Sequence, residues 1–348
     1  DIPLVAYCRH SLKPHFDYDN IFRVTKNGLD FFQDLFDYPY PYPKYEQAFV
    51  PEYNIGAMEN PGLVTFTEDF IFVSGATEDD LEGRANTICH EMAHMWFGDL
   101  VTMKWWDDLW LKESFADFMG ALGAIEANGF NDAWVTFANH RKSWAYLQDQ
   151  LPTTHPIVAD IPHLEAAAQN FDGITYAKGA STLKQLVSYV GFDTFIEAAR
   201  VYFKRFAWGN TSLQDFLDVL NEVSGRDMQT WSQAWLQTPG LSTLGTRRVY
   251  REDGKLQDLY LTQQLPDTQP AGIGRPHVVK LETFILQEEK LVSTGTLSLE
   301  CPADPIAEYR VSLPQEHKKT VGEADLLMLN AEDHTYAKIM LTDEDGLQ

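Results

Sequence analysis

Two histidines and two glutamates in this sequence have the spacing of a catalytic zinc site. Residues 90–94 read His-Glu-Met-Ala-His, and Glu113 follows after a gap of eighteen residues. On a helix, His90 and His94 stand one turn apart, so both imidazoles project from one face toward one point. Two histidines and one glutamate with an open fourth position form a known hydrolase set, so we predict that His90, His94 and Glu113 bind one Zn2+. Glu91 lies about 100° round the helix, where it reaches a metal-bound water, and it is the predicted general base.

The surrounding sequence favours helices at both motifs over a chance string. Apolar residues recur at steps of three and four from Leu81 to Trp96, the pattern of an amphipathic helix, and the two histidines lie off that apolar stripe. A second helical pattern runs from about Asp108 to Ala127, and Asn128-Gly129 follows it as a stop signal. Glu113 lies in the first turns of this second helix. We therefore expect two helices to carry the whole ligand set.

Two further motifs indicate the class of protein. Residues 56–60 read Gly-Ala-Met-Glu-Asn, and residues 174–179 read Ile-Thr-Tyr-Ala-Lys-Gly. In this order and spacing with the motif at residues 90–94, they make the chain resemble the aminopeptidase N family of zinc metallopeptidases, in the gluzincin clan. The resemblance implies a zinc metallo-aminopeptidase similar to the membrane alanyl aminopeptidases.

The resemblance covers nearly the whole chain, with uneven strength. It is strongest over residues 49–120, and it is weaker but recognisable at residues 324–330 and 335–339. The wording of residues 84–88 and 105–110 resembles the bacterial, particularly the actinobacterial, branch of the family. No one of these motifs is decisive, but three in the right order are highly specific.

The first 240 residues are expected to be rich in helices after a start that favours strands. Strand signals fall within residues 45–70, where the resemblance implies an edge strand against which a peptide substrate lies. Helices are expected at about 178–190 and 193–206, and another begins near Ser212 with a capping box of Thr211 and Gln214. Residues 149–172 contain three prolines and are expected to be irregular, with a short helical patch.

The pattern of apolar residues changes after Pro239-Gly240. From there, apolar residues alternate with polar ones, as at Leu259 and Leu261, which is typical of paired strands. With the family resemblance, this change predicts an α+β fold in two domains. We expect a thermolysin-like, mostly helical zinc peptidase domain at residues 1–240 and a small all-β sandwich at residues 241–348.

The resemblance implies that the Gly-Ala-Met-Glu-Asn motif holds the amino end of a peptide substrate. Glu59 would pair with the ammonium group of the substrate, which restricts cleavage to a free amino terminus. Gly56 and Ala57 would offer backbone groups to the peptide, and Met58 would line the pocket for its first side chain. Without the motif, Glu59 is interpreted as a solvent-facing loop carboxylate and Met58 as ordinary core packing.

Tyr176 is the second catalytic residue that the resemblance implies. In the family, the matching tyrosine donates a hydrogen bond to the oxyanion of the tetrahedral intermediate. One such preorganised donor contributes about 3 kcal/mol to catalysis. The alternative is plain packing, because the chain holds 15 tyrosines and most tyrosines lie at core edges.

The chain departs from the family pattern around Glu113. Many relatives carry a carboxylate seven residues after this glutamate, where Gly120 stands here. Asp117 lies four residues after Glu113 on the same helical face, so we expect it to hydrogen-bond one of the zinc-binding histidines. Lys112 and Ser114 differ from the asparagine and glycine that are frequent in relatives, and Lys112 is expected to donate to a backbone carbonyl.

Charge and cysteine usage argue against several kinds of partner. The formal net charge of −24 disfavours nucleic acid and an anionic membrane surface. No apolar run approaches the roughly 18 residues of a membrane span, and no signal-peptide pattern opens the chain. Three widely spaced cysteines (Cys8, Cys89, Cys301) suit a reducing compartment, so a cytoplasmic location is expected. Cys89 adjoins His90, but helix geometry turns its thiol away, and a buried core thiol is expected.

The two ends of the chain suggest a piece of a longer protein. The chain starts at Asp1 without an initiator methionine, and residues 1–7 resemble the link that leaves an upstream β domain in the family. The long helical domain that usually closes these enzymes is also missing. An N-terminal β domain and a C-terminal helical domain are therefore expected in the parent chain.

These features together predict an aminopeptidase that hydrolyses the first peptide bond of peptides with a free amino terminus. Three alternatives stay open. An endopeptidase of the thermolysin type would share the zinc site but would not need Glu59. An enzyme of the leukotriene hydrolase type would share the scaffold and add epoxide chemistry. A non-enzymatic binding module would keep the fold for a partner, and the intact Glu91 argues against it.

Overall fold

The computed structural model describes residues 1–268, 274–303 and 307–341 of the chain. It contains both helices and sheets, which is compatible with the predicted α+β class. Two compact units follow from the contacts within the chain: unit 1 is residues 1–144, 160–180 and 193–226, and unit 2 is residues 145–159, 181–192 and 227–348. A division into domains at residue 240 stays a prediction. Among the described residues, no helix is both long and apolar enough to cross a membrane.

The helices and strands follow one another along the chain in three stretches. Up to residue 148 they are β1 (Leu4–Cys8), η1 (His10–His15), α1 (Tyr18–Phe36), β2 (Tyr45–Val50), β3 (Ala57–Met58), β4 (Leu63–Thr67), η2 (Glu68–Phe70), α2 (Glu78–Ala93), β5 (Thr102–Met103), η3 (Trp106–Asp108), α3 (Trp110–Glu126), α4 (Ala133–Thr136), η4 (Phe137–Lys142) and α5 (Ser143–Gln148). The next are α6 (Leu164–Gln169), η5 (Ile174–Lys178), α7 (Gly179–Val190), α8 (Phe192–Phe206), β6 (Asn210–Thr211), α9 (Leu213–Ser224) and α10 (Met228–Trp235). The last are β7 (Thr243–Tyr250), β8 (Leu256–Gln264), β9 (His277–Gln287), β10 (Lys290–Cys301), β11 (Glu308–Val311), α11 (Gln315–Glu323), β12 (Leu326–Ala331) and β13 (Lys338–Ile339). The short elements η4 and η5 are π-helical turns, and η1, η2 and η3 are 3-10 helices.

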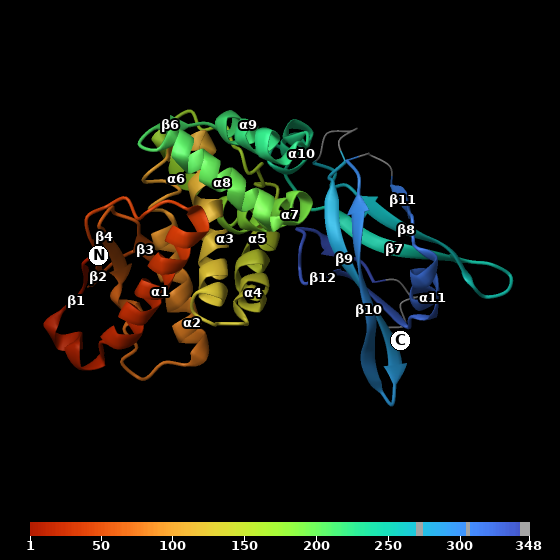
Figure 1. The fold of residues 1–348 in the computed structure, drawn as a ribbon, viewed down its shortest axis with the longest axis horizontal. Coiled ribbons are helices and arrows are strands. Elements are labelled where there is room, and N and C mark those ends of the chain that lie inside the picture. Colours follow the sequence, from red (N-terminus) through yellow and green to blue (C-terminus); the bar gives the residue numbers. More distant parts are fainter. Residues whose placement is uncertain (269–273, 304–306, 342–348) are drawn as a thin grey trace. The chain divides into compact units, whose positions relative to one another are not determined.

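Helices α1, α2 and α3 pack against one another in unit 1 (Figure 1). Aromatic side chains fill the space between α1 and the turn that follows α2, where the centre of the Trp96 ring lies 6.2 Å from that of Phe32 and 5.4 Å from that of Phe36. Between α2 and α3 the backbones approach closely, because a Cβ atom at Gly123 would lie only 3.0 Å from Cys89 Sγ. Cys89 is therefore the buried core thiol that helix geometry predicts.

A four-stranded sheet in unit 1 ends in the short strand β3. The strand order is β1-β2-β4-β3, and β3 runs antiparallel to β4, with Ala57 opposite Phe66 and Met58 opposite Thr65. Since β3 stands at the edge of the sheet, one side of its backbone has no strand partner in the described part of the chain. The strands expected within residues 45–70 are thus present, and β3 is an edge strand.

The helices of the second stretch lie close to their expected positions, but the cap of α9 differs. Both the backbone N–H and the hydroxyl of Ser212 donate to Asp215 Oδ2, at 2.8 and 2.9 Å. Thr211 Oγ1 instead pairs with the Tyr202 hydroxyl at 2.6 Å. The predicted capping box of Thr211 and Gln214 is therefore wrong by one residue, because the carboxylate is a stronger acceptor than an amide.

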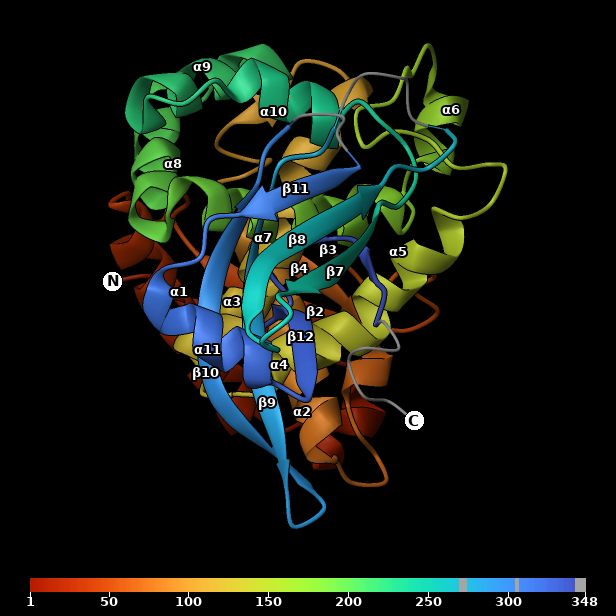
Figure 2. The same ribbon diagram turned by 90° about the vertical axis from the view of Figure 1, so that its right-hand side faces the viewer.

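Unit 2 contains two sheets that share one hydrophobic core (Figure 2). Their strand orders are β10-β9-β12 and β11-β8-β7-β13. Buried and more exposed residues alternate along β8 and β9, as the period-two pattern predicts. The side chains that point inward come from strands of both sheets and include Leu244, Leu259, Leu261, Val279, Leu281 and Leu329.

A buried polar network lies beside this core, where β9 begins. Arg275 is fully buried and donates to four carbonyl oxygens within residues 234–240. His277 Nδ1 lies 2.8 Å from Thr335 Oγ1. Burial, and then the positive charge of Arg275, lowers the pKa of His277 to about 3. The folded chain therefore holds this imidazole in its neutral form.

We expect His277 to make the folded state less stable in mild acid. The pKa of the histidine is about 6.5 when unfolded and about 3 when folded, so the unfolded state binds the proton first as pH falls. The contribution of His277 to the free energy of unfolding is complete above about pH 6.5. Below that pH it falls by about 1.4 kcal/mol per pH unit. Urea unfolding at about pH 7.5 and 5.5 measures the loss, and His277→Gln should show a smaller one. An equal pH dependence in both proteins would contradict this assignment.

Candidate functional site

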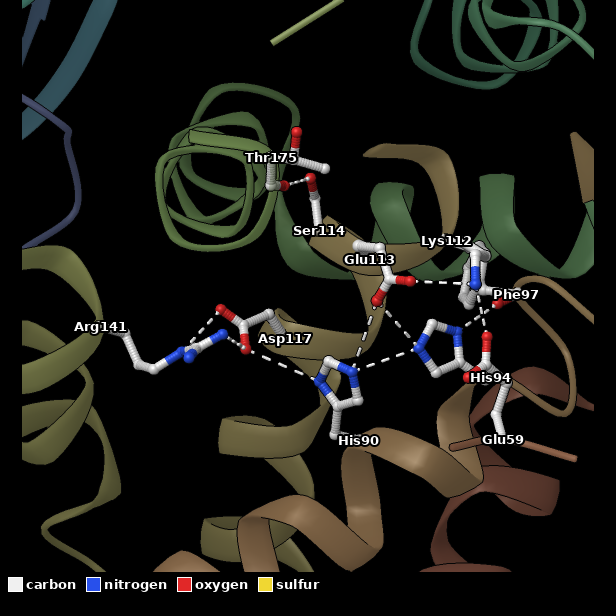
Figure 3. Close-up of polar contacts among 10 residues, drawn as sticks. All are labelled: Glu59, His90, His94, Phe97, Lys112, Glu113, Ser114, Asp117, Arg141 and Thr175. Atoms are coloured by element: carbon white, nitrogen blue, oxygen red, sulfur yellow. Dashed lines mark hydrogen bonds and ion pairs between the residues drawn. The ribbon is translucent and has the colours of Figure 1, made fainter. Parts of the chain in front are cut away.

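The side chains of His90, His94 and Glu113 converge on one point (Figure 3). His90 lies on the last turn of α2, His94 directly follows α2, and Glu113 lies in the first turn of α3. His94 Nε2 lies 3.2 Å from His90 Nε2 and 3.3 Å from Glu113 Oε2. His90 Nε2 lies 3.7 Å from the same glutamate oxygen. The packing of α2 on α3 thus brings together the three residues that the sequence singles out as ligands.

These distances fit a small tetrahedral metal ion. Zinc bonds of about 2.0–2.1 Å place neighbouring ligand atoms roughly 3.3 Å apart. His94 Nδ1 lies 3.0 Å from the Phe97 carbonyl oxygen. This oxygen accepts the proton of Nδ1, so the lone pair of His94 Nε2 remains available for a metal. The donor atoms and their spacing therefore suit zinc, which favours nitrogen and oxygen ligands of this kind.

Glu91 places a buried carboxylate beside the same point. Its side chain is 5% exposed, and its Oε2 atom has no hydrogen-bond partner among the described residues. Donor atoms of Glu91, His90 and His94 lie within 4.8 Å of one another. Burial raises the pKa of Glu91 to about 7, although the charges of the two histidines oppose the rise. A carboxylate with this pKa exchanges protons readily near neutral pH.

A second carboxylate, Asp117, stands behind His90. Asp117 Oδ1 lies 3.6 Å from His90 Nδ1, and Arg141 donates to both oxygens of Asp117, at 3.2 and 2.7 Å. Burial opposes the charged imidazole, but the nearby carboxylates of Asp117 and Glu113 raise the pKa of His90 to about 10. At Gly120, a Cβ atom would already lie 3.0 Å from the Asn86 carbonyl oxygen. The packing therefore leaves no room for a carboxylate at residue 120, and Asp117 stands near His90 instead.

Sequence analysis missed Arg141, which connects two candidate residues. It lies on η4, where its guanidinium carbon is 5.7 Å from the centre of the Tyr176 ring and 5.1 Å from that of Trp144. Arg141 is 24 residues from Asp117 along the chain, so no local motif links them. The one available signal is the basic run at residues 140–142 in an otherwise acidic chain.

Tyr176 reaches the site from the π-helical turn η5. Its ring lies 6.1 Å from the His90 ring, nearly parallel to it. Burial, and then the negative charge of Glu113, raises the pKa of the Tyr176 hydroxyl, so this group keeps its proton and remains a donor. Ser114 Oγ on α3 donates to the Thr175 carbonyl oxygen at 2.6 Å. This bond ties η5 to α3, and π-helical turns are frequent at functional sites.

Glu59 and Lys112 lie on the opposite side of the ligand set from Asp117 (Figure 3). Glu59 directly follows β3 and is 6% exposed. Lys112 Nζ donates to Glu59 Oε1 at 2.5 Å and lies 3.0 Å from Glu113 Oε1. Donor atoms of Glu59, His94 and Glu113 lie within 4.8 Å of one another. Lys112 thus pairs with two carboxylates rather than with the backbone carbonyl expected from the sequence, because charged acceptors bind an ammonium group more strongly.

The candidate residues line one cavity of about 970 Å³. Gly56, Ala57, Met58 and Glu59 contribute to one part of its wall, and Tyr176 to another. The remaining wall combines polar residues, such as Asp79, Asn86 and His140, with five aromatic ones: Phe70, Trp106, Phe137, Trp144 and Phe171. A cavity of this size with apolar walls and a few convergent polar groups is typical of a small-ligand or peptide site.

Known proteins resemble this chain over most of its length. Residues 21–235 match the Peptidase family M1 domain. The chain is 48% identical over 353 residues to "Aminopeptidase N" of Streptomyces lividans, an alignment that covers 99% of this chain and 40% of the relative. It is 37% identical over 219 residues to "Leucyl aminopeptidase" of Saccharolobus solfataricus, with 63% of this chain and 28% of the relative covered. It is 40% identical over 248 residues to "Tricorn protease-interacting factor F2" of Thermoplasma volcanium, with 69% and 30% covered. The chain thus spans two fifths or less of the length of these curated relatives.

The close contact of α3 with the start of α7, next to the turn that carries Tyr176, can be tested by substitution. A Cβ atom at Gly179 would lie 1.9 Å from Ser114 Oγ. We expect Gly179→Ala to lower the free energy of unfolding by about 1–3 kcal/mol, because the core cannot hold the added methyl group. In a chain that also carries Ser114→Gly, the same change should do far less harm. Chemical denaturation of the four proteins measures this coupling, and strictly additive losses would disprove the close contact.

Proposed function

The chain belongs to peptidase family M1, and on that premise we propose that it acts as a zinc-dependent aminopeptidase. This membership confirms the family resemblance seen in the sequence. The proposed reaction is hydrolysis of the first peptide bond of peptides with a free amino terminus. One observation carries the proposal: the donor set, the partly unpaired carboxylate of Glu91 and the buried carboxylate of Glu59 line the same cavity. The first two features suit any zinc peptidase, and Glu59 adds a group that binds an amine.

His90, His94 and Glu113 are the proposed ligands of one zinc ion. A zinc ion held there would lower the pKa of a bound water and would polarise the carbonyl group of the scissile bond. The carbonyl of Phe97 orients His94, and the carboxylate of Asp117 stands behind His90 for the same purpose. Such outer contacts fix the tautomer and the direction of each imidazole.

Glu91 and Tyr176 are the proposed catalytic residues. Glu91 takes a proton from the attacking water while the oxygen of that water bonds to the carbonyl carbon. It then passes this proton to the leaving amine nitrogen as the C–N bond breaks. Tyr176 donates a hydrogen bond to the carbonyl oxygen as negative charge develops on it. The neighbouring Arg141 packs over the Tyr176 ring and supports its orientation.

The segment from Gly56 to Glu59 is the proposed binding site for the amino end of the peptide. Strand β3 offers one backbone side that has no strand partner among the described residues, and an extended peptide pairs readily with such an edge. In this proposal Gly56 and Ala57 bind the peptide backbone, and Met58 lines the pocket for the first side chain. Glu59 binds the ammonium group, and peptides are the expected partners.

We also propose a cytoplasmic location for this activity. Cys8, Cys89 and Cys301 are all free thiols, which suits a reducing compartment. The formal net charge of −24 supports the view that neither nucleic acid nor an anionic membrane is a partner.

A comparison of two variants tests the metal ligands against the general base. Glu91→Gln keeps the size of the side chain but takes no proton, so zinc should be retained while turnover falls by about 10²–10⁴. His94→Ala removes a ligand and should abolish both zinc binding and turnover. Metal analysis and hydrolysis of an aminoacyl reporter amide measure the two effects. Full zinc content in His94→Ala rules out the ligand set, and turnover within about tenfold of wild type in Glu91→Gln rules out the base.

Removal of a single hydroxyl group tests the oxyanion donor. Tyr176→Phe should lower kcat by about 10²–10³, because it removes a hydrogen bond made only in the transition state. Zinc content and KM should stay close to those of the wild type. Tyr18→Phe, at an exposed position on α1, is the matched control. A rise in KM with unchanged kcat would instead assign Tyr176 to substrate binding.

The N-terminal ammonium group is tested with blocked substrates. An aminopeptidase should cleave the free reporter amide and leave its N-acetylated form intact. Equal cleavage of both forms, or cleavage inside a longer blocked peptide, would favour an endopeptidase.

A further inference from the structure

Lys112 holds a buried position that the proposed mechanism does not use. Its side chain is 13% exposed and lies between the side chains of Glu59 and Glu113 (Figure 3). Its Nζ atom is 2.5 Å from Glu59 Oε1 and 3.0 Å from Glu113 Oε1. The ammonium group of Lys112 therefore already binds one oxygen of Glu59. This is the carboxylate to which the amino terminus of the substrate is proposed to bind.

The local backbone directs Lys112 to this position. Gly98 has a φ of +130°, and a Cβ atom there would lie 3.3 Å from Lys112 Cβ, from Lys112 Cδ and from His94 Nδ1. The glycine thus lets the lysine stem pack against the segment that follows α2. Lys112 lies in the first turn of α3, and the end of its side chain reaches Glu59.

We infer that Lys112 is a tethered competitor of the substrate's amino-terminal ammonium group, and that it reduces the preference of this site for a free amine. This inference rests on the proposed function of Glu59 and of the metal ligands. An incoming ammonium group has to displace Lys112 from Glu59 or share the carboxylate with it. Either event weakens binding, because displacement breaks a charge-assisted hydrogen bond and sharing brings two positive charges close together.

A structural role for Lys112 predicts the opposite effect. If the lysine only holds Glu59 in a productive orientation, its removal should weaken the binding of an amine. If it competes, its removal leaves Glu59 buried without that partner, and the carboxylate should bind an amine more strongly. The sign of the change therefore separates a competitor from a positioning residue.

Two hydroxamates that differ in one amino group measure this sign. L-leucine hydroxamate and its des-amino analogue, 4-methylpentanohydroxamate, carry the same metal-binding group and the same side chain. Calorimetry on the zinc-loaded chain gives both dissociation constants, and the des-amino to amino ratio is the contribution of the ammonium group. We expect Lys112→Met, which keeps the apolar stem, to raise this ratio by about tenfold or more, the size of one hydrogen bond to a charged group.

Three further variants complete the design. Glu59→Gln should bring the ratio of dissociation constants close to one. The resulting fall in the ratio should be larger in the Lys112→Met chain than in the wild type, because the ratio starts higher there. Lys104→Met removes an exposed lysine that pairs with Asp215, so it changes the net charge equally and should leave the ratio unchanged. Lys112→Gln is a second neutral variant for the case that Lys112→Met does not fold, which thermal unfolding and metal content reveal.

The outcomes separate this inference from the proposed function. A ratio that falls or stays the same in the folded neutral variants would overturn the competitor role of Lys112. Failure of the des-amino hydroxamate to bind the zinc-loaded wild type would overturn the proposed metal site, and the inference with it. Binding of that analogue to every variant together with a raised ratio in Lys112→Met is the result that supports both.

Discussion

The close approach of α2 and α3 is the contact on which the rest of the site depends. Two glycines of α3 make it possible, since a Cβ atom at Gly120 would lie 3.0 Å from the Asn86 carbonyl oxygen and one at Gly123 would lie 3.0 Å from Cys89 Sγ. With the backbones this close, His90 and Glu113 meet across the interface, one from the end of α2 and one from the start of α3. A larger separation would leave ligand atoms too far apart to share an ion with bonds of about 2 Å.

Around that contact, acidic and basic side chains lie next to one another. Glu59, Lys112 and Glu113 form one side of the series, and His90, Asp117 and Arg141 form the other (Figure 3). Isolated buried charges are strongly destabilising, so the buried carboxylates of Glu59, Glu113 and Asp117 are stable in their charged form only beside donors or cations. This mutual dependence makes the site sensitive to single substitutions. It also explains why a lysine at residue 112 affects more than its own position, since it neutralises part of two carboxylates with different proposed tasks.

Local patterns predicted much of the secondary structure, and they failed where a distant group competed. The period of three and four from Leu81 to Trp96 matches α2 as far as Ala93, where the helix ends, and the alternation around Leu259 and Leu261 matches β8. The capping box was placed one residue early, because Tyr202 binds the Thr211 hydroxyl and Asp215 takes over the cap. The expected backbone acceptor for Lys112 was likewise replaced by Glu59, which lies 53 residues away along the chain. In both cases a charged or distant partner decided between two locally reasonable hydrogen bonds.

By itself the sequence predicted the chemistry that is proposed for this chain, and the tertiary structure decided how its charged groups pair. The spacing of His90 and His94 is a local quantity, because one helical turn relates residues four apart whatever surrounds the helix. The roles expected for residues 56–60 and for Tyr176 came instead from the family resemblance of their motifs. The partners of the charged residues were not predictable in either way, since Arg141 reaches Asp117 and Lys112 reaches Glu59 only after separate elements have packed. Hydrogen bonds and ion pairs act over a few ångströms in space, and nothing in the order of residues records which distant side chains the packing will bring within that range.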